Sequence, residues 1–215
     1  APSHCMTCGR KLRWYDMVPV FSWLMLGGKC RNCKSKISVQ YPIIEGVNGI
    51  LYVVIFAVNG LVWSSVIYCL MASALLVLSV IDWRTYEIPF GINVFLFVLG
   101  VAMTVLDRGN LVEHLIGMVC VSGALEVLYL VSGGGAIGGG DIKLMFACGL
   151  LLGWKLILLA FFLGCIIGSV VHIVRMVTKK AGRVLAMGPY LSAGILLAAL
   201  WGNAWINWYL SLLGV

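Results

Sequence analysis

Long apolar runs separated by short polar segments make up nearly all of the chain after residue 42. Runs of this length and composition predict membrane-spanning helices. The run Ile142–Trp154 is too short to cross a bilayer squarely, so its helix is expected to begin in a protein-lined cavity. The tail Ala204–Leu213 is rich in aromatic residues and is predicted to be interfacial. The predicted spans are Ile43–Trp63, Ser65–Ile81, Phe90–Leu106, Leu111–Val131, Ile142–Trp154, Leu156–Val177 and Met187–Trp201.

Composition supports a membrane protein. Of the 215 residues, 62% are hydrophobic and only 11% are charged, whereas soluble domains contain about 45–50% apolar and about 25% charged residues. This composition excludes an ordinary soluble enzyme, a disordered chain and a collagen-like fibre. The predicted fold class is therefore an all-α polytopic membrane protein with about six to eight transmembrane helices.

Residues 1–42 are polar and are predicted to form a small domain of their own, with residues 43–215 as the transmembrane domain. The formal charge of +7 does not point to nucleic acid, since no basic stripe runs beside aromatic residues. If residues 1–42 face the cytoplasm, the predicted spans place 13 of the 15 Lys and Arg residues on that side and leave Arg108 and Lys155 outside. This asymmetry is the positive-inside pattern. No apolar segment precedes the polar one, so no signal peptide is predicted.

Four of the eight cysteines form two CxxC pairs, Cys5/Cys8 and Cys30/Cys33. Two such pairs at this separation predict a zinc site, because each turn directs two thiolates at one point and two turns complete a tetrahedron. Four thiolates leave no open coordination position, so the zinc is expected to be structural. The alternatives are a redox dithiol or cysteines that bind nothing.

Two acidic residues stand at the predicted cytoplasmic edge of the apolar region. Asp82 ends one span, and Asp141 opens another after a segment with six glycines among residues 133–140. Paired carboxylates that share a proton can activate water, as in aspartic proteases. The glycines would let an extended substrate backbone approach closely. The alternative is that both aspartates merely end or cap helices, which suits Asp141 better than Asp82.

The chain resembles the type IV prepilin peptidases, the bacterial GxGD membrane aspartyl proteases. The matching motifs follow the family order from residue 5 to residue 194. They are the CxxC pairs with Trp14–Leu24 between them, Tyr41-Pro42-Ile-Ile-Glu45, Ile81-Asp82 with Pro89, Gly138-Gly-Gly140-Asp141-Ile-Lys143, and Gly188-Pro189-Tyr190-Leu191 with Gly194. Family members usually carry a further apolar helix before the cysteine domain, for which this sequence shows no counterpart.

The resemblance implies that Asp82 and Asp141 are the catalytic pair and that Gly138, Gly140 and Lys143 belong to the substrate loop. It implies cleavage of prepilins or pseudopilins after a glycine that follows a short basic leader. It also implies N-methylation of the new amino terminus with S-adenosylmethionine, for which Glu45 and the polar face of residues 9–42 are candidates. The implied location is the bacterial inner membrane, in contact with lipid, with the active site and zinc domain facing the cytoplasm.

Two other classes of function remain open at this point. A non-enzymatic membrane scaffold whose zinc domain recruits partners would explain the cysteines but not the two aspartates. An ion-coupled transporter using Asp82, Asp141 and Glu126 would favour acids near the midplane and an internal repeat, and the sequence shows no clear repeat. Otherwise Glu126 is expected in an interhelical hydrogen bond, and His114 is expected to be interfacial.

Overall fold

The computed structural model describes residues 3–135, 137–178 and 185–214. These residues fall into two compact units, residues 1–54 and 55–215, which are considered separately below. Three basic residues counted on the expected cytoplasmic side, Lys179, Lys180 and Arg183, lie outside the described residues.

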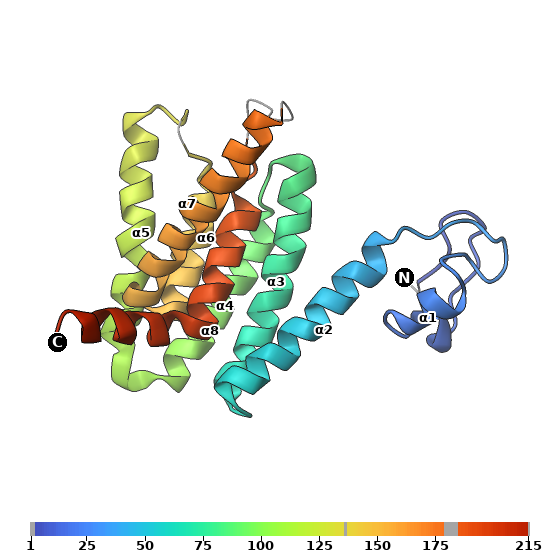
Figure 1. The fold of residues 1–215 in the computed structure, drawn as a ribbon, viewed down its shortest axis with the longest axis horizontal. Helices are drawn as coiled ribbons and strands as arrows, with labels where there is room; N and C mark the ends of the chain where they lie inside the picture. The colour runs from blue at the N-terminus through green and yellow to red at the C-terminus, as the bar shows by residue number, and fades with distance from the viewer. Residues whose placement is uncertain (1–2, 136, 179–184, 215) are drawn as a thin grey trace. The chain divides into compact units, whose positions relative to one another are not determined.

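Helices dominate the described residues, and no strand is present among them (Figure 1). Five helices are long and apolar enough to cross a membrane, and two shorter ones, α4 and α6, accompany them. This confirms the predicted all-α multi-pass fold. The helices are α1 (Phe21–Met25), α2 (Gln40–Asn59), α3 (Trp63–Thr85), α4 (Phe90–Leu106), α5 (Leu111–Val131), α6 (Gly139–Leu152), α7 (Trp154–Val177) and α8 (Gly188–Leu212), with short 3-10 turns at Trp14–Met17 and Arg108–Asn110.

The first unit is built around two similar turns. Each CxxC pair is flanked by an isolated β-bridge, His4 with Lys11 in one case and Lys29 with Lys36 in the other. In each turn the residue four positions after the first cysteine has a positive φ, +66° at Gly9 and +57° at Lys34. The two segments thus repeat one backbone pattern, which presents both cysteine pairs in the same way.

The second unit is a helical bundle, and its shortest α-helix, α6, has the largest share of buried residues. Nine of the residues of α6 are buried, and the helix packs against α4, α5 and α7 (Figure 1). A helix of 14 residues would span only about 21 Å. Its neighbours, rather than lipid, therefore surround it, as expected for a short element at membrane depth.

Glycines set the closest helix contacts. A Cβ on Gly117 of α5 would lie 2.5 Å from the carbonyl oxygen of Gly149 on α6. A Cβ on Gly194 of α8 would likewise clash with the carbonyl oxygen of Ala160 on α7. Such backbone-to-backbone approach is how small residues hold membrane helices together.

Two details of the sequence predictions need correction, on α8 and on Glu126. The seventh span and the aromatic tail form one helix, α8, and Figure 1 shows its last part (dark red) running in a different direction from its first. His114, near the end of the bundle away from the aspartates, is buried and donates from Nδ1 to the carbonyl oxygen of Leu150 at 2.8 Å. Glu126 is exposed on α5 rather than packed between helices.

Candidate active site

Asp82 lies in the last turn of α3 and is 4% exposed. Its Oδ2 accepts a hydrogen bond of 2.9 Å from the backbone N–H of Gly188, the first residue of α8. The carboxylate of α3 therefore supplies an acceptor to the amino-terminal end of a different helix. Because Asp82 stands at the carboxyl end of its own helix, the dipole of α3 alone would favour its protonated form. The amino-terminal end of α8 opposes that dipole argument, because it stabilises negative charge on Asp82.

Asp141 is the third residue of α6 and lies in its first turn. The N-cap position belongs to Gly138, which has no side chain, so Asp141 is not the N-cap residue that the simpler interpretation required. Its backbone N–H donates to the carbonyl oxygen of Gly138 at 3.1 Å. The side chain is half-buried and remains directed toward the start of the helix, since a Cβ on Gly138 would lie 3.2 Å from its Oδ2.

One pocket of about 300 Å³ brings the two aspartates together. Asp82 and Asp141 both line it. The sequence placed both residues at one membrane depth, and the structure places them at one cavity. The three predicted substrate-loop residues, Gly138, Gly140 and Lys143, line the same pocket.

Two glycines make room for this arrangement. A Cβ on Gly188 would lie 2.7 Å from Asp82 Oδ2, and one on Gly140 would lie 2.9 Å from the Cβ of Ile88. The space left by the missing side chain of Gly140 is therefore filled by Ile88 of the protein itself. The sequence had predicted that these glycines would make room for a substrate backbone. Side chains at either position would push apart the segments that carry the carboxylates.

A cation and further polar side chains also line the pocket. Lys143 follows Asp141 by two residues, and its Nζ lies 5.5 Å from the centre of the Phe90 ring. Glu87 and Asn93 also line the pocket. Asn93 was not among the predicted site residues, although a carboxamide one turn into the otherwise apolar start of a predicted span was a usable signal.

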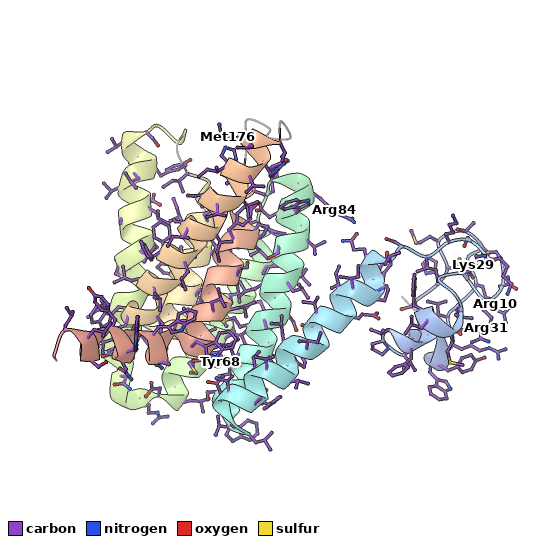
Figure 2. All side chains as sticks on the ribbon, in the orientation of Figure 1. Arg10, Lys29, Arg31, Tyr68, Arg84 and Met176 are labelled. Carbon is purple, nitrogen blue, oxygen red and sulfur yellow. The ribbon has the colours of Figure 1, made fainter. Side chains whose placement is uncertain are left out.

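The site lies at the end of the bundle where α3 and α7 both finish. Arg175 in the last turn of α7 stacks on Trp83, the residue after Asp82, at 5.5 Å. Figure 2 shows Arg84 and Met176 at this end of the bundle and Tyr68 near the other. The opposite end carries the ion pair between Lys155 and Glu113, with an Nζ–Oε1 distance of 3.0 Å. The basic residues Arg84, Lys143 and Arg175 thus share the end that holds the two aspartates.

The four paired cysteines converge in the first unit, which also carries Arg10, Lys29 and Arg31 (Figure 2). Their sulfur atoms all lie within 4.8 Å of one another, and those of Cys5 and Cys33 are 3.8 Å apart. Sulfurs at the corners of a zinc tetrahedron with bonds of about 2.3 Å are about 3.8 Å apart. The donor set and its spacing therefore fit a four-coordinate zinc ion.

Local hydrogen bonds favour the thiolate form that a metal requires at two of the four cysteines, Cys5 and Cys33. Backbone N–H groups of Cys8 and Thr7 lower the pKa of Cys5 to about 6. Hydrogen bonds from Ser35 lower the pKa of Cys33. A zinc ligand must be deprotonated, so these contacts reduce the cost of assembling the site at neutral pH.

A bundle of membrane helices with paired carboxylates in a pocket at one end is the architecture of a membrane aspartic peptidase. Comparison with family models matches residues 1–59 to the bacterial Peptidase A24 N-terminal domain and residues 69–173 to the type IV leader peptidase family. The chain belongs to the type IV leader peptidase family.

Individual relatives agree with this assignment. A protein named prepilin leader peptidase/N-methyltransferase from Stutzerimonas stutzeri is 32% identical over 94% of this chain and 72% of its own length. The proteins of that name from Neisseria gonorrhoeae and Xanthomonas campestris are 32% and 30% identical, covering 97% and 100% of this chain and 75% and 77% of their own lengths. No solved structure gives a significant match.

Proposed function

We propose that this protein is a prepilin leader peptidase and N-methyltransferase with Asp82 and Asp141 as its catalytic pair. The observation that carries the proposal is the single pocket lined by both carboxylates in a chain of this family. The relatives' name joins peptidase and methyltransferase activities, and this chain covers most of their length. Both features favour the enzyme over a scaffold or an ion-coupled transporter.

In the proposed cleavage step the two carboxylates share one proton. The ionised aspartate takes a proton from a water molecule, and the protonated one donates a hydrogen bond to the carbonyl oxygen of the scissile peptide. Water oxygen bonds to the carbonyl carbon, and the C–N bond then breaks as a proton passes to the leaving amine. The leader departs with a new carboxylate, and the apolar helix of the pilin keeps the new amino terminus.

A position at the end of the bundle suits this substrate. A peptide bond inside a membrane helix is shielded by the helix, whereas one just beyond its apolar part is easier to unwind. Lys143 and Arg84 add positive charge at this end, in keeping with the charge asymmetry of the sequence. We place this end, and the zinc-binding unit, on the cytoplasmic side of the inner membrane.

The first unit is proposed to bind zinc and S-adenosylmethionine. Zinc held by Cys5, Cys8, Cys30 and Cys33 would stabilise a domain too small to fold on its core alone. A cavity of about 730 Å³ lies beside the cysteines, and Trp23, Tyr41 and Glu45 are among its lining residues. S-adenosylmethionine supplies the methyl group, and the Glu45 carboxylate offers a partner to its positive charge. Glu45 also accepts a hydrogen bond from the Val20 backbone N–H at 3.0 Å, which fixes its position.

Purified protein incubated with a model prepilin tests both activities, with the products followed by mass. The account predicts loss of the leader after its terminal glycine, and a further methyl mass when S-adenosylmethionine is present. Absence of cleavage by folded, zinc-loaded protein would contradict the peptidase proposal.

A Glu45→Gln variant examines the proposed methyl-donor site separately. Cleaved but unmethylated pilin should accumulate, because the variant removes the charge beside the cavity and leaves the Asp82/Asp141 pocket intact. Full methylation by Glu45→Gln would show that Glu45 is not part of the methyl-donor site.

A further inference from the structure

Asn93 is buried, and its carboxamide makes no hydrogen bond within the part of the chain that the structure describes. It is 4% exposed, and neither its Nδ2 nor its Oδ1 has a hydrogen-bond partner among the described residues. Burying an unpaired carboxamide costs free energy, so such groups are rare in folded proteins. A polar group of this kind at a pocket points to a ligand that satisfies it.

Its surroundings identify which ligand. Asn93 lies one turn after Phe90 on α4, and both residues line the pocket that holds Asp82 and Asp141. Residues 138–141, at the start of α6, line the same pocket, and nothing lies within 4 Å of a Cβ at Gly139, so the backbone is open there. A chain lying in this pocket would pass the two carboxylates and meet the Asn93 side chain.

We propose that the Asn93 carboxamide binds the backbone of the unwound substrate next to the scissile bond. This inference rests on the proposed peptidase function. A substrate helix must open before an aspartic pair can reach a peptide bond, and opening it frees backbone N–H and C=O groups. In an apolar setting those groups need new partners. In an extended chain the N–H and C=O of one residue point to the same side, and a carboxamide can accept from the first and donate to the second.

This role makes Asn93 a substrate-binding residue that favours the extended over the helical form of the substrate. Its pairing with the unwound backbone would offset part of the cost of opening the helix. The unpaired state in the free enzyme then has a purpose, because an amide already bonded within the protein would be unable to pair with the substrate.

The test compares Asn93→Leu with the parent on two prepilins. One is all-peptide, and in the other an ester replaces a backbone amide beside, but not at, the scissile bond, which removes one N–H donor. We expect Asn93→Leu to lower kcat/KM on the peptide substrate about tenfold or more, the effect of one or two hydrogen bonds. The ester should slow the parent by a similar factor and have little further effect on Asn93→Leu. Such non-additivity is the mark of a direct interaction.

Stability measurements separate this role from a structural one. Removing an unpaired buried amide should leave the thermal stability of Asn93→Leu equal to or above that of the parent, while cleavage falls. Ser192→Ala is the matched control, since Ser192 is also buried, its Oγ has no hydrogen-bond partner in the described ranges, and it does not line the pocket. Its cleavage should equal that of the parent. Asn93→Ser provides a second variant if leucine prevents folding.

Each outcome decides a different question. If the parent cleaves and Asn93→Leu cleaves equally well, the role of Asn93 is wrong and the peptidase proposal stands. If Asn93→Leu is slower but the ester adds its full effect, Asn93 acts elsewhere, for example on the attacking water, and backbone pairing is overturned. If the folded parent cleaves neither substrate, the peptidase proposal itself fails and this inference fails with it.

Discussion

Asp82 and Gly188 are 106 residues apart, yet one hydrogen bond joins them at the centre of the proposed active site. No local pattern in the sequence predicts this bond, because it depends on how α3 and α8 pack. The two aspartates were easier to predict, since charge is rare in apolar runs and both residues fall at one edge. Asn93 was missed because its importance comes from the lack of a partner, which only packing reveals.

Gly188→Ala tests the support of the Asp82 carboxylate. The new methyl group would lie 2.7 Å from Asp82 Oδ2 and 2.9 Å from Leu78 Cδ2, so the carboxylate must move. We expect the free energy of unfolding to fall by about 1–3 kcal/mol and kcat to fall about hundredfold, because a shift of about 1 Å misaligns the pair. Thermal unfolding and initial cleavage rates in detergent measure the two effects.

Gly49→Ala is the control, since nothing lies within 4 Å of a Cβ at this helical glycine. Parent-like cleavage by Gly188→Ala would mean that the position of Asp82 does not depend on α8.

At the scale of elements, apolar runs predicted most helices to within a few residues, because lipid imposes the length of a spanning helix. The shortness of α6 was also predicted. The extent of α8 was not, because its aromatic tail suggested a separate interfacial segment, whereas the helix continues to Leu212. The close contact between α5 and α6 could not be predicted either, since a glycine in a sequence does not indicate which helix packs against it.

Gly117→Ala tests that contact. Its Cβ would lie 2.5 Å from the Gly149 carbonyl oxygen and 2.7 Å from the Trp154 backbone nitrogen, neither of which can rotate away. Helices α5 and α6 must separate, and α6 carries Asp141. We expect a loss of about 1–3 kcal/mol in unfolding free energy, measured by denaturation in mixed micelles, and slower cleavage.

Gly123→Ala on the same helix should have little effect, since the nearest atom is the Val119 side chain at 3.4 Å. Equal stability of the two variants would show that the α5–α6 contact is less tight than described.

For the whole molecule, composition and cysteine spacing predicted a small metal-binding domain joined to a membrane bundle. The convergence of the four cysteines was predictable because CxxC turns constrain geometry locally. The repeated backbone of the two turns was not, because Gly9 and Lys34 share a positive φ without sharing a residue type.

Metal analysis of purified protein tests the zinc proposal. The parent should contain about one zinc per chain, and Cys8→Ser or Cys33→Ser should contain well under half of that, since either change leaves three thiolate ligands. Cys165→Ser, which changes a cysteine of α7 outside the cluster, should retain the parent's zinc. Equal zinc in all variants would exclude this four-cysteine site.

The most direct test of the central claim is prepilin cleavage by the parent, Asp82→Asn and Asp141→Asn, measured by mass at equal protein concentration. Glu126→Gln makes the same change of charge at an exposed acid on α5 and serves as the control. The account predicts cleavage by the parent and by Glu126→Gln, and a loss of at least about a thousandfold in each aspartate variant, because neither carboxylate can act alone. Substantial cleavage by a folded Asp82→Asn or Asp141→Asn would contradict the account.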